Sequence, residues 1–133
     1  MTEIQNSPKE LLRNPTGQAK QYDLEERTLK FAADVRNFVR KIPRTISNVE
    51  DGKQVIRASG SVGANYIEAN EALSKKDFVI RIKICRKEAK ETKYWLILVY
   101  LGGNKLVEKE RASLIKEASE LTKIFGSILE KCK

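Results

Sequence analysis

Residues 78–99 read FVIRIKICRKEAKETKYWLILV, and their apolar positions repeat at alternating spacings of four and three. That rhythm is typical of a helix whose seam packs against a partner helix. A second row of positions lies beside the seam, so we expect this helix to be packed on two sides. The seam consists of Phe78, Ile82, Cys85, Ala89, Thr92, Leu96 and Val99, and the second row of Ile84, Glu88, Glu91, Trp95 and Leu98.

Capping signals bound this helix on both sides. Ser74 is a good N-cap, with Asp77 placed three residues on as a partner for the first turn. Gly102-Gly103-Asn104 is predicted to end the helix, because glycine adopts the left-handed conformation past a helix C-terminus at least cost.

Three more helices are predicted around it. The first starts near Tyr22 or Asp23 and is stopped by Pro43, since proline disfavours helical geometry in the preceding residue. The second starts at a cap of Ser47 or Asn48, has Glu50 and Asp51 in its first turn and runs to about residues 70–72. The fourth covers about residues 107–131. Small residues within 58–64 are interpreted as a place where a neighbouring helix approaches closely, because no phosphate-loop sequence accompanies them.

Four helices with mostly short connections predict an all-α fold, an antiparallel up-and-down four-helix bundle. Residues 22–133 form the bundle, and residues 1–21 are expected to be a flexible N-terminal arm, because they lack sustained periodicity. The chain of 133 residues is long enough for one hydrophobic core without disulfides, so we expect Cys85 and Cys132 to be free thiols.

The formal net charge of +8 favours polyanionic partners. Residues 74–94 hold eight Lys and Arg against three Asp and Glu, so the positive charge is concentrated on the third predicted helix. Residues 1–20 lack the apolar middle of a secretory signal, and no apolar run is long enough to span a bilayer. We therefore expect a cytoplasmic protein that does not engage membranes.

The chain contains no histidine. This excludes Ser-His-Asp and Cys-His catalysis, His-containing zinc sites and the Glu-x-x-His pattern of di-iron bundles. We therefore expect no catalytic residues, no metal and no cofactor, and a protein that is not an enzyme.

A set of charged and amide side chains lies on or near the inner faces of the second and third helices. Because a buried charge requires a partner, we interpret this set as a paired polar network that fixes helix register. A metal or catalytic carboxylate site and a more exposed surface are the alternatives. The network comprises Arg57, Asn65, Glu68, Arg81, Glu88 and Glu91.

Basic side chains project from the third helix opposite its seam, and the acids of the same segment fall outside their sector. We predict an anion-binding face here, of which nucleic acid is the expected ligand; the alternative is a solvated face that provides solubility. Tyr94 and Tyr100 are expected to be packing groups rather than base-stacking ones. The predicted nucleic-acid-binding residues are Lys75, Lys76, Lys83, Arg86, Lys87, Lys90 and Lys93.

Three motifs in the centre of the chain match a known family in order and spacing. They are Ser61-Val62-x-Ala64-Asn65-x-x-Glu68, then Ser74-Lys75-Lys76-Asp77-Phe78, then Lys87-Glu88-Ala89-x-Glu91-Thr92-x-Tyr94-Trp95-Leu96. This region resembles the bacterial four-helix bundle proteins encoded in intervening sequences of large-subunit ribosomal RNA genes, some of which are described as ribosomal proteins.

The resemblance implies a bundle that assembles as a homo-oligomer, a pentamer, without known catalysis. It also implies a relationship to the accessory variability protein of diversity-generating retroelements, and with it nucleic acid (RNA or DNA) and a reverse transcriptase as partners. Two functions remain open: a basic oligomeric protein that binds nucleic acid through phosphate contacts, and an assembly scaffold with an acidic protein partner.

Overall fold

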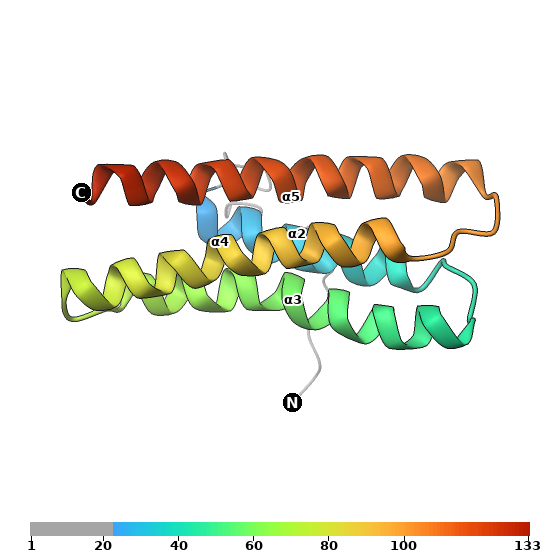
Figure 1. Cartoon of the computed structure of the whole chain (residues 1–133), viewed down its shortest axis with the longest axis horizontal. Coiled ribbons are helices and arrows are strands. Elements are labelled where there is room, and N and C mark those ends of the chain that lie inside the picture. The colour runs from blue at the N-terminus through green and yellow to red at the C-terminus, as the bar shows by residue number, and fades with distance from the viewer. Residues whose placement is uncertain (1–22) are drawn as a thin grey trace, which may run out of the picture.

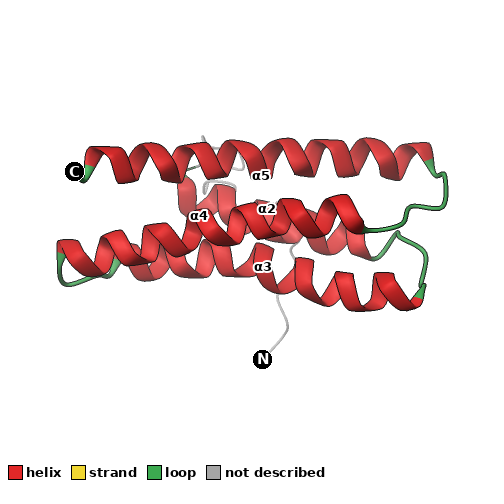
Figure 2. Ribbon diagram, in the orientation of Figure 1, coloured by secondary structure: helices red, strands yellow, loops and turns green. Residues whose placement is uncertain are grey.

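The computed structural model describes residues 23–133, in which the only regular elements are four helices (Figure 2). The predicted N-terminal arm, residues 1–21, lies outside the described residues. The helices are α2 (Leu24–Val39), α3 (Ile46–Asn70), α4 (Lys75–Leu98) and α5 (Lys105–Lys131).

Successive helices run in opposite directions, and each contacts its two neighbours around the bundle (Figure 1). In that view α4 lies between α5 and α3, with α2 behind it. The contact between α2 and α5 is the least extensive, and the contact between α3 and α4 is the most extensive. The prediction of an antiparallel up-and-down all-α bundle is confirmed.

Each helix begins at a side chain that accepts a hydrogen bond from the first turn. Ser74 caps α4 by accepting from the Asp77 amide, as predicted. Asp23 caps α2 by accepting from the Glu26 amide. The predicted caps of α3 are wrong: the cap is Thr45, whose Oγ1 accepts from the Asn48 amide at 3.1 Å. Because α3 starts earlier than expected, Glu50 and Asp51 lie beyond its first turn.

Two helices end earlier than their sequence signals predicted. After Val39 the amides of Lys41 and Ile42 bond to carbonyls three residues back, so α2 closes in tighter turns before Pro43 is reached. Helix α4 ends at Leu98 although the left-handed Gly102 and Gly103 come later.

The early end of α4 is stabilised by a residue from the next helix. The guanidinium of Arg111 in α5 donates to the carbonyl of Val99 at 2.7 Å and lies within 3.5 Å of the carbonyls of Leu96 and Ile97. These carbonyls have no partner within the helix, so the cation satisfies them and opposes the negative end of the helix dipole.

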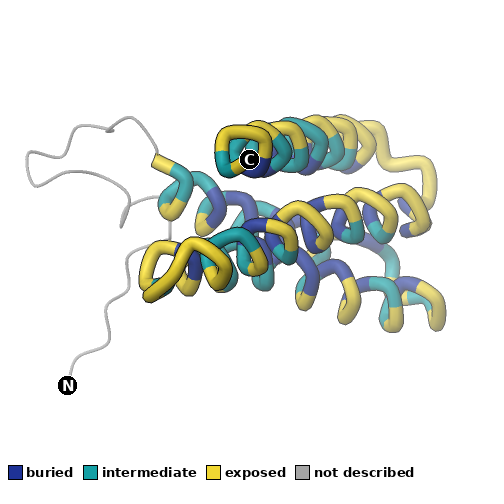
Figure 3. Tube along the Cα trace, turned by 60° about the vertical axis from the view of Figure 1, so that its left-hand side comes forward, coloured by how far each residue is buried: buried dark blue, intermediate teal, exposed yellow. Residues whose placement is uncertain are grey.

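The predicted seams form the core, and buried residues face inward on every helix (Figure 3). On α4 the seam from Ile82 to Val99 is buried, whereas Phe78 at its start is only half-buried. Tyr66 and Ile128 are half-buried as well, and Leu129 is buried in the last turns of α5. The fully buried side chains of largest volume are Phe31, Phe38, Phe125, Ile82, Leu96 and Leu121.

Small residues bring α3 close to α2. A Cβ placed on Gly63 would lie 2.8 Å from Oγ1 of Thr28. The Thr28 hydroxyl is buried and donates to the Leu24 carbonyl at 2.7 Å, so it already occupies this space. The interpretation of the small residues as a close-approach surface is confirmed at this position.

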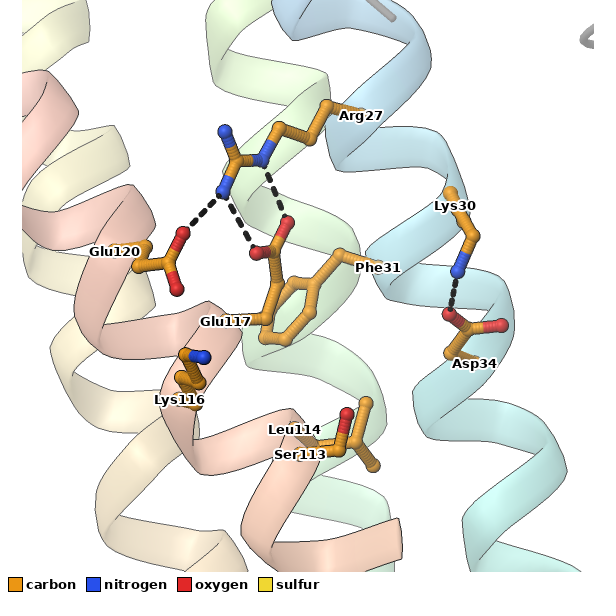
Figure 4. A pocket seen from close by; sticks show the side chains of 9 residues that line it. All are labelled: Arg27, Lys30, Phe31, Asp34, Ser113, Leu114, Lys116, Glu117 and Glu120. Carbon is orange, nitrogen blue, oxygen red and sulfur yellow. Dashed lines mark hydrogen bonds and ion pairs between the residues drawn. The ribbon is translucent and has the colours of Figure 1, made fainter. Parts of the chain in front are cut away.

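Helices α2 and α5 are joined by charged side chains around a cleft of about 550 Å³ (Figure 4). Arg27 of α2 points across it and binds both carboxylate oxygens of Glu117, at 2.7 and 2.8 Å, and Glu120 at 3.0 Å. These hydrogen bonds, chiefly to Glu117, raise the pKa of the Arg27 guanidinium further above its ordinary value. A second ion pair, Lys41 with Glu110 at 2.9 Å, joins the turn that follows α2 to α5.

Candidate nucleic-acid interface

The predicted basic residues all belong to α4, and all are exposed. From Lys83 to Lys93 the helix rises about 15 Å, so the charges form a row along its axis. Lys75 and Lys76 extend this row into the first turn of α4. All seven predicted residues therefore lie exposed on one helix: Lys75, Lys76, Lys83, Arg86, Lys87, Lys90 and Lys93.

Two adjoining hollows lie along this row, each of about 410 Å³. The first is lined only by α4 residues, namely Lys83, Arg86, Lys87, Lys90, Glu91 and Tyr94. The second lies between α4 and α5 and is lined by Lys90, Lys93, Tyr94, Ile97, Ser119, Thr122 and Lys123. Because Lys90 and Tyr94 line both, the two hollows adjoin at these side chains, and together they are named here the α4–α5 groove.

The expectation that Tyr94 and Tyr100 are packing groups is wrong. Each is 58% exposed. Tyr94 sits at the junction of the two hollows, where its ring meets Trp95 edge-on at a centroid distance of 5.1 Å. Tyr100 follows the end of α4 and lines neither hollow. An aromatic ring therefore stands among the lysines of the α4–α5 groove.

Two of the three acids on α4, Glu88 and Glu91, are bound by an arginine from α3. Arg57 contacts both carboxylate oxygens of Glu88 at 3.4 Å and one of Glu91 at 3.1 Å. The Glu88 side chain is 7% exposed, whereas Glu91 is 40% exposed and reaches the edge of the groove. Lys87 approaches Glu88 at 3.7 Å. These contacts compensate the carboxylates and leave the remaining basic side chains of the row to solvent.

The other predicted members of the polar network, Asn65, Glu68 and Arg81, do not join the cluster around Arg57. Arg81 does not pair with Glu88; its guanidinium donates to Oδ1 of Asn65 at 2.9 Å, and the Asn65 amide donates to the Ser61 carbonyl. Glu68 is exposed and, among residues 23–133, makes no hydrogen bond or ion pair with the other members. Within residues 23–133 the members of the predicted network thus form two separate links between α3 and α4 rather than one continuous network.

Replacing Arg57 with Met is expected to lower the free energy of unfolding by about 1 kcal/mol, because buried Glu88 loses its principal partner. The effect is limited because Arg57 is itself 49% exposed and Lys87 remains near Glu88. Urea denaturation measures the change. Lys53→Met is the matched control, since its partner Glu50 is 69% exposed and its loss is expected to be near zero. Equal effects of the two substitutions would contradict a structural role for the Arg57 pair.

The described region contains neither a cluster of metal-ligating side chains nor a disulfide. Between residues 23 and 133 no group of three or more His, Cys, Asp or Glu side chains is placed to hold a metal ion. Both cysteines are free. Burial raises the pKa of the Cys85 thiol to about 12, so it stays protonated while its sulfur donates to the Val62 carbonyl. Of the four described helices, none is both long and apolar enough to cross a membrane.

Sequence reasoning identified the α4 side of the groove and missed the α5 side. Ser119, Thr122 and Lys123 line it because α5 packs beside α4 at this level. A helical projection of either segment alone contains no signal for that juxtaposition. The exposure of Tyr94 follows from its position among the lysines on the outer side of α4, about 160° around the helix from the seam residues Thr92 and Leu96.

Comparisons with known proteins give a consistent result. Residues 20–127 match the family model described as 23S rRNA-intervening sequence protein. No curated protein matches the chain. The chain is similar to the crystal structure of a protein with unknown function from the S23 ribosomal protein family of Bacteroides thetaiotaomicron VPI-5482, at 29% identity and a TM-score of 0.68. That similarity covers 80% of this chain and 98% of the other. The chain belongs to the 23S rRNA-intervening sequence protein family.

Proposed function

We propose that this protein is a non-enzymatic nucleic-acid-binding protein and that the basic row of α4 is its contact surface. The observation that carries this proposal is the row of exposed Lys and Arg side chains along one helix, beside which Glu88 and Glu91 are already bound by Arg57. Lys and Arg at such a surface displace the counterions condensed on a phosphate backbone. Contacts of this kind position a nucleic acid without reading its sequence.

The direct test is reversal of three charges in the centre of the row. Lys83, Lys87 and Lys90 are each replaced with Glu, and binding to unrelated sequences is measured by fluorescence anisotropy at several salt concentrations. We expect affinity to fall at least tenfold, by similar factors for all sequences. Each lost phosphate contact is expected to lower the slope of log affinity against log salt by about 0.9 for duplex DNA and about 0.7 for a single strand.

A matched control carries the same charge change elsewhere. Arg40, Arg44 and Lys53 are exposed and lie outside α4, so their replacement with Glu changes the net charge equally. Circular dichroism monitors folding in both variants. An equal loss of affinity in the control would mean that net charge, rather than the α4 row, determines binding. A wild-type protein that fails to bind nucleic acid even at low salt would favour the alternative, a scaffold for an acidic protein partner.

We also propose that the protein assembles as a homo-oligomer, for which the family resemblance suggests a pentamer. Large apolar side chains remain exposed on three helices of a small bundle, among them Leu29 on α2, Ile67 on α3 and Ile80 on α4, each 46–49% exposed. Neighbouring copies that cover such side chains remove them from water, and repeated contacts of one kind close into a ring.

Light scattering at micromolar concentration is expected to give a mass several times the 15.2 kDa of one chain, with five times that mass for a pentamer. Leu29→Glu and Ile67→Glu, made separately, are expected to reduce this mass, because a charge placed in an apolar contact opposes burial. A single-chain mass for the wild-type protein would contradict assembly.

A further inference from the structure

We infer that the α4–α5 groove accepts an unpaired nucleic-acid strand, RNA or DNA, and that one of its bases stacks on Tyr94. This inference rests on the nucleic-acid binding proposed above and specifies the ligand of the same surface. The first step is the position of Tyr94, at the point shared by both hollows and 58% exposed. A tyrosine ring flanked by cationic side chains is the arrangement by which proteins hold bases and backbone of a single strand together.

The walls of the groove provide the second step. Lys90, Lys93 and Lys123 supply positive charge from two helices, and Ile97, which is 55% exposed, adds an apolar surface beside Tyr94. An exposed isoleucine side chain has neither a charge nor a hydrogen-bond donor with which to bind a phosphate. It suits the face of a base, which is largely apolar, while the lysines follow the backbone.

The third step is the shape of the surface, which is unfavourable for inserting α4 into the major groove of a duplex. A single helix with its side chains is about 10–12 Å across and fits a major groove about 12 Å wide only when it protrudes from its protein. Helix α4 contacts α3 and α5 along its two sides, so it does not protrude (Figure 1). A duplex can contact the lysines, but its bases are stacked internally and offer no open face to Tyr94.

The experiment compares Tyr94→Ala with Tyr100→Ala, because both tyrosines are 58% exposed and only Tyr94 lines the groove. The probes are labelled oligonucleotides about 12 nucleotides long, within the range of single-strand site sizes. They are oligo-dT, oligo-U, an abasic strand with the same number of phosphates, and a duplex. Tyr94→Ala is expected to weaken oligo-dT and oligo-U binding about tenfold, the loss typical of truncating one base-stacking aromatic. It should leave the abasic strand and the duplex unchanged, and Tyr94→Phe should retain the wild-type affinity.

The outcomes separate this inference from the proposed function. If the wild-type protein binds all four probes and Tyr94→Ala changes none of them, or all of them equally, stacking is contradicted while phosphate binding stands. If the wild-type protein binds no probe, the proposed function fails with it. Trp95, the only tryptophan of the chain, contacts Tyr94 and provides a second readout. Its fluorescence is expected to change with oligo-dT and not with the abasic strand.

Discussion

Replacing Asn48 with Ala is expected to lower the free energy of unfolding by about 3 kcal/mol, measured by urea denaturation. Asn48 is 3% exposed, and its side chain links two loops. Its amide donates to the carbonyls of Pro43 at 2.8 Å and Tyr100 at 2.7 Å, and its Oδ1 accepts from the Tyr100 amide at 2.9 Å. The substitution leaves one backbone donor and two backbone acceptors without this partner in a partly buried place. Each such group costs about 1–3 kcal/mol when fully buried, so a total near the low end of the sum is expected.

Two further variants test the origin of this effect. Asn48→Asp keeps the acceptor but removes both donors and places a carboxylate against two carbonyls, so it is expected to be at least as destabilising as Ala. Asn37→Ala removes an exposed side chain that, among residues 23–133, accepts only from Arg40, and a change of less than about 0.5 kcal/mol is expected. An Asn48→Ala protein as stable as the Asn37→Ala protein would show that the two loops do not depend on this side chain.

The helices were predictable because their signals are local. The seam of α4 and the Ser74 cap each depend on residues within a few positions, and both were located correctly from the sequence. Asn48 and Arg111 were not recognised for what they do, since their partners lie far away along the chain. Asn48 was interpreted as a helix cap because asparagine before an apolar row is a cap signal, whereas its bonds to Tyr100 exist only after α3 and α4 have packed.

In the candidate site, too, the features set by one helix were predictable and those set by the packing of two helices were not. The side of α4 on which Lys83, Lys87 and Lys90 lie follows from 100° of rotation per residue, and the structure places all of them there. The members of the polar network were predicted as a set, but their pairing was not: Arg57 binds Glu88, whereas Arg81 binds Asn65. Which cation reaches a buried carboxylate depends on the rotation and stagger of two packed helices. A single sequence does not specify either quantity at the resolution of one side chain.

Gly63→Ala is expected to lower the free energy of unfolding by about 2 kcal/mol, although alanine in an unhindered helix raises it by about 1 kcal/mol relative to glycine. The added Cβ would lie 2.8 Å from Oγ1 and 3.2 Å from Cβ of Thr28. Thr28 cannot turn away freely, because it is fully buried and its hydroxyl donates to carbonyls of its own helix, at 2.7 and 3.1 Å. Helix α2 must therefore move from α3, which loosens a close-packed contact.

Gly126 provides the matched control, since it also lies inside a helix but a Cβ there would meet nothing within 4 Å. Gly126→Ala is expected to raise the free energy of unfolding by about 0.5–1 kcal/mol, so the two substitutions should have opposite signs. Combining Gly63→Ala with Thr28→Ala removes the nearest obstructing atom, Oγ1 of Thr28, and the double variant should be more stable than the sum of the single changes predicts. Additive effects in this cycle, or stabilisation by Gly63→Ala, would contradict a close approach of α2 and α3 at Gly63.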